Sequence, residues 1–500
     1  MSRIMGEWEV HVALLGVTVY ALLRIREKRR IDDLLASYGP DVKLPPHLIS
    51  YVPYLGSAIE MGKGIRVFIA KHSAKFGEPL FTATIAGEHA LFIGDSDHLP
   101  MIYTHSKQLD GFALQKQFTR NVLGIKDNND EELMFDMDNE SEIATKLVKQ
   151  YHKYILSDGE LNKTVAKAQD IFNTLIPRLI DSSSIDGWHR HDLYGLVREL
   201  IFEASVEPFL SKHLATKENS ELFQMFDKGV PLMFGNAPSF IVKESDEARE
   251  ELLKRITEGR FIEQGSALMK ERQELLPDNV FQRTALGLLF ASVGNSIPSV
   301  FWCLYHILLD PVARKAVQAE VDSVVEMKRG DEGTISLSLD ELKGMEILSS
   351  CFSEALRLYQ GAFTVREATD NFVFDPKKKG QHRYLIQKGT RVMAFQSTLH
   401  YNEALFDRPE TFQYDRFLPK NGKQVSERNI RPFGGGTRLC PGRKFIRYEV
   451  QAFVALLLSQ FDMRIVEGSP QPNINYAMQG VGISHPDKSI MVEMRLRKKD

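Results

Sequence analysis

The stretch "FGGGTRLCPG", from Phe433 to Gly442, places one of the three cysteines of the chain among four glycines and a proline. The glycines permit backbone conformations and close approaches that side chains would block. Pro441 follows Cys440 and suits the first turn of a helix, and the apolar spacing after it is helical. We therefore expect Cys440 at a helix N-terminus, where backbone N–H groups and the helix dipole stabilise a thiolate.

Arg438 adds a cation close to Cys440 that can bind a carboxylate through both guanidinium edges. A thiolate on a loop that admits a flat partner, beside such an arginine, suits the axial ligand of a haem iron. A lone cysteine is more often a small buried hydrophobe, but that interpretation does not account for the glycines. A phosphate loop is a further alternative, yet the stretch satisfies neither GxGxxG nor GxxxxGK[ST].

Composition limits the remaining possibilities. The 500 residues are 43% hydrophobic and 26% charged, which indicates a large buried core. A net charge of -3 gives no support to nucleic-acid binding. The cysteines Cys303, Cys351 and Cys440 have no CxxC spacing, so neither a disulfide framework nor a zinc cluster is indicated, and we expect a reducing compartment. No flexible linker divides the chain after about residue 60, and residues 57–500 are therefore expected to form one catalytic domain.

The N-terminus differs from the rest of the chain. The apolar run "VHVALLGVTVYALL", Val10 to Leu23, is followed at once by basic residues. Its length of about 14 residues is short for a bilayer crossing, and a signal peptide or a buried helix are alternatives. Because most charges follow the run, we interpret residues 1–30 as an uncleaved membrane anchor with a cytoplasmic basic flank. The segment 31–56, which contains "KLPPHLISYVPYLG", is predicted to be a proline-rich hinge that orients the catalytic domain.

The remaining pattern predicts a mainly helical chain with small β-sheets. Helical periodicity extends over about residues 145–360. Strands are expected in a hairpin with a Gly-Glu turn and in three later runs: Pro79–Ile93, Phe372–Phe374, Tyr384–Ile386 and Ile490–Arg495.

One predicted helix is unusually long. It is capped by Asp278 and Asn279 and runs to Leu309, about 30 residues. Pro298 lacks an N–H group, so the carbonyl of Gly294 loses its helical partner and the helix should kink there.

The glycine-rich stretch resembles the cysteine-ligand loop of the cytochromes P450, since Phe433, Gly436, Arg438, Cys440 and Gly442 each match. The resemblance implies the cytochrome P450 fold, with a long central helix over the haem and the cysteine loop beneath it. It further implies haem b as cofactor, Cys440 as the iron ligand, and the other four matching residues as parts of the haem-binding loop.

Companion motifs follow the family order. "SEALR" supplies Glu354 and Arg357, and "YDRF" supplies Arg416; the resemblance gives this trio a structural role behind the cysteine loop. In "FTVRE", Arg366 stands where the family often has a haem-propionate partner, and a plain surface arginine is the alternative. The Trp-x-x-x-Arg propionate motif is not apparent between residues 100 and 270.

The middle of the long helix departs from most of the family. The usual acid and threonine, which serve proton delivery, fall on Gly294 and Asn295 in "FASVGNSIPSVFW". A relay through Asn295, Ser292 or water is then the expectation. The Gly-Asn-x-x-Pro-x-x-Phe-Trp arrangement is similar to that of the sterol 7-hydroxylase and prostacyclin synthase group.

That group includes two chemistries. The first is a monooxygenase that acts on a steroid, sterol or terpenoid with O2 and electrons from NADPH-cytochrome P450 reductase. The second is an isomerase or dehydratase of lipid peroxides, which needs no reductase. Arg438 and Pro441 keep the monooxygenase pattern, and we favour that function; a haem carrier or sensor without turnover is a third class.

The resemblance also implies an endoplasmic reticulum membrane protein whose catalytic domain faces the cytosol. The basic side chains that follow the cysteine form either a patch for a reductase or a solvated helix face: Arg443, Lys444 and Arg447. Substrate contacts are expected in four segments: 100–125, 205–240, 360–366 and Ala477–Val481.

Overall fold

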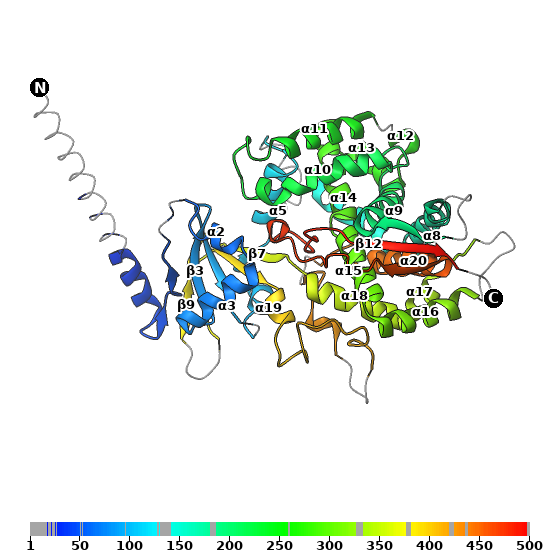
Figure 1. Cartoon of the computed structure of the whole chain (residues 1–500). Helices are drawn as coiled ribbons and strands as arrows, with labels where there is room; N and C mark the ends of the chain where they lie inside the picture. Colours follow the sequence, from blue (N-terminus) through cyan, green and yellow to red (C-terminus); the bar gives the residue numbers. More distant parts are fainter. Residues whose placement is uncertain are drawn as a thin grey trace, which may run out of the picture.

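The structure is a computed structural model that describes Thr18, Leu22, Arg26 and residues 28–50, 52, 54–95, 97–127, 130, 142–180, 187–258, 261–326, 334–376, 382–419, 425–435 and 439–497. Most of the predicted anchor therefore lies outside the described residues. Figure 1 shows a sheet-rich part next to a larger helical part. The sheet-rich part combines strands from the N-terminal quarter of the chain with strands from residues 363–395.

The largest sheet has six strands in the order β2-β3-β4-β10-β7-β5. β3 and β4 form the predicted antiparallel hairpin. Its turn is Ala86-Gly87, with φ of 49° and 82°, one residue earlier than the predicted Gly-Glu turn. The strand bounds are β2 His47–Leu48, β3 Leu80–Ile85, β4 Glu88–Ile93, β5 Leu109–Asp110, β7 Phe363–Ala368 and β10 Arg391–Phe395.

Two three-stranded sheets have the orders β1-β9-β8 and β11-β12-β6. The strands predicted near residues 372, 384 and 490 are all present. β6 was not predicted: it lies in a region expected to be helical, and its polar sequence "HRHD" is an edge strand paired only with β12. The bounds are β1 Val42–Lys43, β6 His189–Asp192, β8 Phe372–Phe374, β9 Arg383–Ile386, β11 Phe461–Ile465 and β12 Met491–Leu496.

The predicted hinge is not a free spacer. Residues 28–38 are helical, β1 pairs with β9, and β2 pairs with β3. Pro45 and Pro46 lie between these two edge strands, where the missing N–H of proline costs no ladder hydrogen bond. Residues 42–48, which lie inside the segment 31–56 predicted to be a hinge, are thus part of the sheets of the folded domain.

Helices make up most of the structure, as predicted. They are α2 Ala58–Met61, α3 Ile65–Phe76, α4 Met101–Thr104, α5 Phe112–Asn121, α7 Glu142–Tyr151, η1 His152–Leu156, α8 Asp158–Leu175, η2 Ile176–Leu179, α9 Leu193–Phe209, α10 Lys217–Phe234, α11 Lys243–Glu258, α12 Phe261–Gln264, α13 Ala267–Leu275, α14 Asp278–Val293, α15 Ser296–Leu309, α16 Pro311–Val325, α17 Leu339–Gly344, α18 Glu346–Tyr359, α19 Ser397–His400, η5 Glu427–Asn429, α20 Arg443–Gln460 and η7 Tyr476–Met478.

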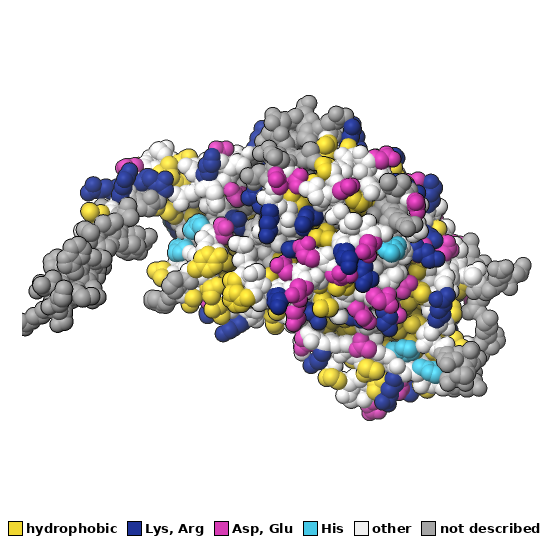
Figure 2. All heavy atoms as spheres, turned by 90° about the horizontal axis from the view of Figure 1, so that it is seen from above, with side chains coloured by type: hydrophobic (Ala, Val, Ile, Leu, Met, Phe, Trp, Pro, Cys, Tyr) yellow, Lys and Arg dark blue, Asp and Glu magenta, His cyan; other side chains and the backbone are white. Residues whose placement is uncertain are grey.

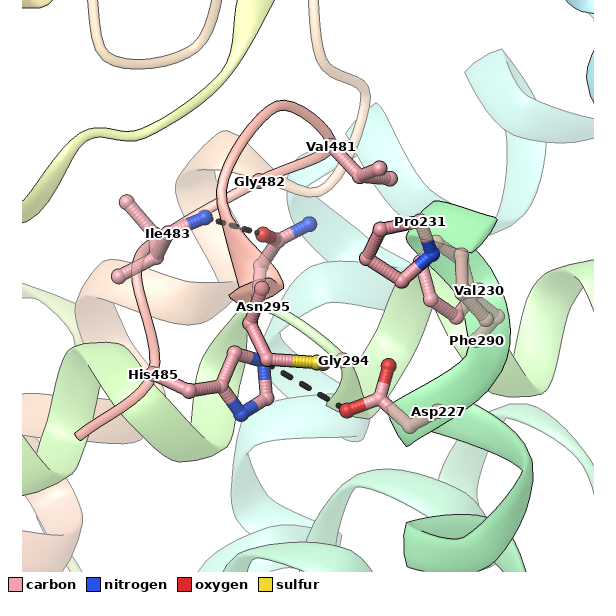
Figure 3. Close-up of a pocket in the computed structure, with 11 residues that line it drawn as sticks. Asp227, Val230, Pro231, Phe290, Gly294, Asn295, Val481, Gly482, Ile483 and His485 are labelled. Carbon is pink, nitrogen blue, oxygen red and sulfur yellow. Dashed lines mark hydrogen bonds and ion pairs between the residues drawn. The ribbon is translucent and has the colours of Figure 1, made fainter. Parts of the chain in front are cut away.

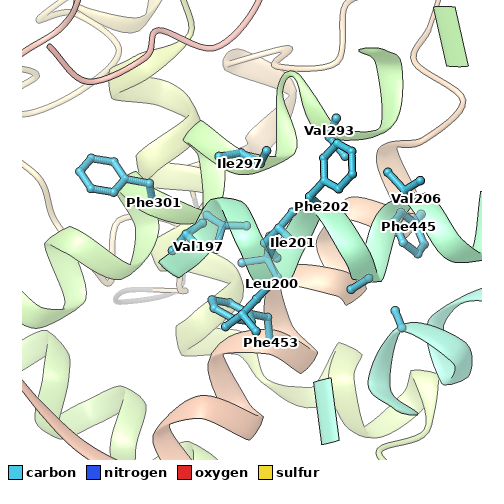
Figure 4. Close-up of a cluster of buried hydrophobic side chains, with 14 of the residues drawn as sticks. Val197, Leu200, Ile201, Phe202, Val206, Val293, Ile297, Phe301, Phe445 and Phe453 are labelled. Atoms are coloured by element: carbon cyan, nitrogen blue, oxygen red, sulfur yellow. The ribbon is translucent and has the colours of Figure 1, made fainter. Parts of the chain in front are cut away.

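The main core lies where α9 crosses between the long helix and α20. Figure 4 shows Phe202 and Leu200 of α9 with Val293 of α14, Phe301 of α15 and Phe453 of α20. All five side chains are at most 2% exposed. The helix that follows Cys440 is therefore fixed by apolar packing in the same core as the long helix, and this packing sets the position of the cysteine loop.

The long helix has the predicted extent but is interrupted. α14 ends at Val293 and α15 begins at Ser296, so the break falls on Gly294 and Asn295, as the missing N–H of Pro298 predicts. The predicted cap is wrong: Pro277 is the N-cap, and Asn279 instead donates to Asp130.

Length and apolar composition alone would let Asp278–Leu309 cross a membrane. It is the one such helix among the described residues. Because 72% of its most apolar stretch is buried, it is a core helix of the domain.

Trp302 fastens the second half of the long helix to its surroundings. Its ring stacks on Tyr359 of α18 with centroids 3.7 Å apart, and its Nε1 donates to the carbonyl of Ser484 at 2.7 Å.

Trp302→Ala is expected to lower the free energy of unfolding by about 3–5 kcal/mol. Trp302→Phe keeps the apolar contact but leaves a buried carbonyl unpaired, so about 1–3 kcal/mol is expected. Urea unfolding measures both; a Trp302→Phe variant as stable as the wild type would contradict the assigned hydrogen bond.

Candidate functional site

The cysteine loop closes through its own backbone. The N–H of Cys440 donates to the carbonyl of Phe433 at 3.0 Å, and Gly434 adopts a φ of 78° that favours glycine. α20 begins at Arg443 with Gly442 as N-cap, so Cys440 lies just before the helix. Pro441 precedes the helix and is not in its first turn, which corrects the prediction.

The predicted loop residues Gly436 and Arg438 lie outside the described residues. The carboxylate-binding role expected of Arg438 therefore stays a prediction.

Two opposing effects act on the thiol of Cys440. Burial raises its pKa, whereas the backbone N–H groups of Gly442 and Arg443 and the charge of Arg443 lower it. Burial is the larger effect in the protein without a bound metal. The backbone groups expected to stabilise a thiolate are thus in place, and a cation at the sulfur would favour the thiolate further.

Cys440 is the one cysteine that can reach a ligand. Cys303 and Cys351 are completely buried in the helical core, whereas Cys440 is partly exposed and forms no disulfide. Within the described ranges, no group of three or more His, Cys, Asp or Glu side chains could hold a metal ion. A single thiolate with no companion protein ligands fits an iron that a porphyrin already coordinates.

The basic residues after the cysteine have partners inside the protein. Arg443 donates to the carbonyl of Cys440 at 2.8 Å, and Lys444 pairs with Asp158 at 2.8 Å. Arg447 pairs with Glu427 at 2.7 Å and lies over the ring of Phe433. These contacts connect the cysteine loop and the start of α20 to their surroundings; a basic patch for a reductase stays a prediction.

Behind the loop lies a buried ion-pair network. Arg357 donates to both carboxylate oxygens of Glu354, at 2.7 and 2.8 Å, and Arg416 donates to Glu354 at 2.8 Å. Glu354 and Arg357 are fully buried, and Arg416 is 5% exposed. The three side chains predicted to act together therefore meet in one place.

Backbone carbonyls take up the remaining guanidinium hydrogens. Arg357 donates to the carbonyls of His400 and Pro409, each at 2.7 Å. Arg416 donates to three carbonyls between residues 407 and 411. The two ring nitrogens of His400 contact the carbonyls of Arg357 and Ile430. Ile430 lies three residues before Phe433, the first residue of the cysteine loop. His400, which sequence reasoning did not find, thus connects the network to the cysteine loop.

Arg366 is a partly buried cation on β7. Its described contacts are a hydrogen bond to its neighbour's carbonyl and the close approach of Gly111, whose Cβ would lie 3.3 Å from the guanidinium. Burial lowers the pKa of Arg366, and no ion pair to a carboxylate is found for it in the described part of the chain. A partly desolvated guanidinium with no ion pair to a described carboxylate fits an anionic partner from outside the chain.

The residues predicted for the oxygen side divide into two groups. Gly294 and Asn295 occupy the helix break, and the carbonyl of Asn295 accepts from Ser299. Ser292 is engaged within the helix: its hydroxyl donates to the carbonyl of Leu289 and it does not line the neighbouring pocket. Ser292 is therefore poorly placed for the predicted relay.

Asn295 is a tether between the long helix and the C-terminal loop. Its Oδ1 accepts from the N–H of Ile483 at 2.9 Å. A Cβ on Gly482 would lie 1.9 Å from this oxygen, so a glycine is required for the contact. The amide nitrogen of Asn295 points into a pocket (Figure 3).

The pocket lies between α10, the helix break and the C-terminal loop. Its volume is about 20 Å³, which is room for one water molecule. Apolar walls and a few polar groups line it: Val230, Pro231, Phe290, Met478, Val481 and Ile483, with Asp227, Gly294, Asn295, Gly482 and His485. Asp227 and His485 were missed by sequence reasoning because no spacing in the sequence connects two residues so far apart.

Comparisons with known proteins agree with this geometry. The family model described as Cytochrome P450 matches residues 46–494. Cytochrome P450 7B1 of Mus musculus is 26% identical over 89% of this chain and 89% of its own. Cytochrome P450 7A1 of Sus scrofa is 27% identical over 91% and 93%. Cholesterol 7-alpha-monooxygenase of Cricetulus griseus is 26% identical over 91% and 94%.

A solved structure has the same fold. Retinoic acid-bound cyanobacterial CYP120A1 superposes with a TM-score of 0.69 at 18% identity, covering 91% of this chain and all of that chain.

The buried network leads to a stability prediction. Glu354→Gln leaves two buried guanidinium groups without their carboxylate, so a loss of about 3–5 kcal/mol in the free energy of unfolding is expected. The control is Glu410→Gln, which removes an exposed pair with Arg66 and should cost less than about 1 kcal/mol. Urea unfolding compares the two, and equal midpoints would contradict a network of this importance.

Proposed function

The chain belongs to the cytochrome P450 family and is a monooxygenase, and we propose that it hydroxylates a sterol or a related bulky lipophilic molecule. The observation that carries the proposal is Cys440, the one partly exposed cysteine, on a glycine loop directly before α20. The names of the relatives support the substrate class. One is cholesterol 7-alpha-monooxygenase, and another is 7-alpha-hydroxycholest-4-en-3-one 12-alpha-hydroxylase.

The family's cofactor is a thiolate-ligated haem, and the residues of this chain fit it. Cys440 would bind the iron, and Arg366 would pair with a propionate. Gly434 and Gly435 carry no side chain that would block a flat ring, and a Cβ on Gly435 would lie 3.1 Å from the ring of Tyr103. When bound, the haem supplies oxygen activation and oxidation of a C–H bond.

Apolar side chains of the pocket are proposed to form part of the wall of the substrate site. Val230, Pro231 and Phe290 face Val481 across it (Figure 3). The pocket itself has room for one water molecule and not for a sterol, so it marks one edge of that site. The pocket includes residues from two of the four predicted substrate segments, 205–240 and Ala477–Val481.

We also propose attachment to the endoplasmic reticulum membrane and reduction by NADPH-cytochrome P450 reductase. Large hydrophobic side chains are exposed near the N-terminal helix, including Ile49 at 74%, Tyr54 at 63% and Val67 at 62%. Figure 2 shows hydrophobic side chains gathered on this smaller part, while charges of both signs mix over the larger one. Such an apolar surface favours contact with a membrane.

An isomerase of lipid peroxides is the second candidate, and Gly294 and Asn295 favour it because neither supplies the usual acid or alcohol. The two functions differ in their need for electrons. A monooxygenase requires NADPH and adds one oxygen atom to its product, whereas an isomerase leaves the mass of its peroxide substrate unchanged.

Product mass is the measurement that separates these functions. The purified protein with its reductase is incubated with sterols and with lipid peroxides, with and without NADPH. We expect a gain of one oxygen atom in a sterol, only with NADPH. Cys440→Ala should abolish both this product and the thiolate-haem spectrum of the reduced carbon monoxide complex. An isomeric product formed from a peroxide without NADPH would overturn the proposal.

Arg366 provides a separate test of the cofactor assignment. Arg366→Leu removes a charge-assisted hydrogen bond to a propionate, and haem should dissociate roughly tenfold faster into an excess of a haem-binding acceptor protein. The matched control is Arg391→Leu on the neighbouring strand β10, which removes a pair with Glu88 and should leave haem dissociation unchanged. Equal rates in the two variants would exclude Arg366 as a propionate partner.

A further inference from the structure

Asp227 is a buried acid that the proposed chemistry has not yet used. It lies on α10, is 7% exposed and lines the pocket at the helix break. Its one polar contact among the described residues is His485, whose Nε2 is 3.5 Å from Oδ2 (Figure 3). Burial raises the pKa of Asp227 to about 7, so a large fraction of it carries a proton at neutral pH.

His485 has a second polar neighbour besides Asp227. Its Nδ1 lies 2.9 Å from the hydroxyl of Tyr194 on α9. Burial lowers the pKa of His485 to about 4, so its ring is neutral, with one nitrogen donating and the other accepting. Arg198, which is also on α9, donates to Gln224 at 2.6 Å, and its positive charge acts to lower the pKa of Tyr194. A neutral imidazole between a hydroxyl and a carboxyl can pass protons between them.

The pocket brings Asp227 to the break in the long helix. The carbonyl of Gly294 has no helical partner because Pro298 lacks an N–H, and the amide nitrogen of Asn295 points into the same space. A water molecule needs two to four polar partners to be bound in a protein interior. Asp227, Gly294 and Asn295 provide this number around a volume that suits a single water molecule.

We propose that Asp227 is the proton donor of this site, acting through a water molecule held in the pocket, and that His485 returns the proton to it. This inference rests on the proposed monooxygenase function. The carboxyl O–H bond breaks as a bond to the water oxygen forms, and the water in turn gives one of its own protons to the oxygen atom that the proposed monooxygenase reaction reduces to water. Asp227 then regains a proton by way of His485 and ultimately from solvent, and no electron moves in these steps.

The arrangement replaces the acid that most members carry on the long helix. Here the acid comes from α10, across the pocket, while the helix contributes a carbonyl and an amide that orient the water. The structure thus assigns the proton to a residue that lies 67 positions before Gly294 in the chain.

The protonation of Asp227 can be measured without turnover. In infrared spectra of the resting protein, the wild type minus Asp227→Asn difference should contain the C=O stretch of one protonated carboxyl group. This band should disappear as pH rises, with a midpoint near 7. If no such band is present between pH 5 and 8, Asp227 is ionised throughout and the inference is overturned.

The pH dependence of stability gives a second measurement. An acid whose pKa is raised by folding destabilises the native state as pH rises from its unfolded value near 4 toward 7. Asp227→Asn removes this effect, so the stability of the variant relative to wild type should increase over that pH window. A difference that does not vary with pH would contradict a raised pKa at Asp227.

Turnover then tests the role of the proton. Asp227→Asn should lower product formation roughly a hundredfold, at the low end for general acid catalysis, with more NADPH consumed per product. The fall in wild-type activity above pH 7 should be absent in the variant. Substrate affinity, measured by equilibrium dialysis, should stay within about twofold of wild type. A variant with weakened binding but unchanged product per NADPH would mean that Asp227 contacts the substrate instead, which overturns the inference.

The matched control is Glu449→Gln. Glu449 is also completely buried, its pKa is raised to about 8, and its partner is Ser205, away from the pocket. Glu449→Gln should keep the wild-type ratio of product formed to NADPH consumed. If it lowers this ratio as much as Asp227→Asn does, replacing any buried acid has this effect, and the inference for Asp227 is overturned. Absence of any oxygenated product from the wild type would refute the proposed function, whereas the infrared result concerns Asp227 alone.

Discussion

The shape of the site depends on one buried carboxylate, that of Glu354, placed between two guanidinium groups. Two cations and one anion would be very unfavourable in a protein core if charge pairing were their only compensation. Backbone carbonyls between residues 400 and 411 complete the hydrogen bonding of Arg357 and Arg416. Since those carbonyls belong to an irregular segment, the ion pairs fix a stretch of chain that has little secondary structure of its own, and His400 extends this order to Ile430 and the cysteine loop.

The features that sequence could predict are those set by local chemistry. The glycine loop, the helix after it and the break near Pro298 each follow from residue types at short spacing, and the structure has all three. The trio of Glu354, Arg357 and Arg416 was assigned through family motifs, and the side chains do meet. The strands of the hairpin and of the later runs also appear where alternation predicted them.

What sequence could not predict depends on contacts between distant segments. Nothing local indicates that the side-chain oxygen Oδ1 of Asn295 accepts a hydrogen bond from the N–H of Ile483, or that His485 lies next to Asp227. The strands β1 and β2 of the proline-rich segment were not predicted for the same reason, because each is a strand only through its pairing with β9 or β3.

The C-terminal loop at residues 480–485 has contacts with three separate parts of the molecule. It binds Asn295 at the helix break, Trp302 in the second half of the long helix, and the backbone of Gly361 beyond α18. Its Val481 also faces the pocket. A change of side chain that reshapes this loop therefore also displaces Asn295 and the pocket beside it, where we propose that the proton is delivered. Substrate preference and catalytic efficiency are consequently not independent traits here, and selection or engineering for one must retune the other.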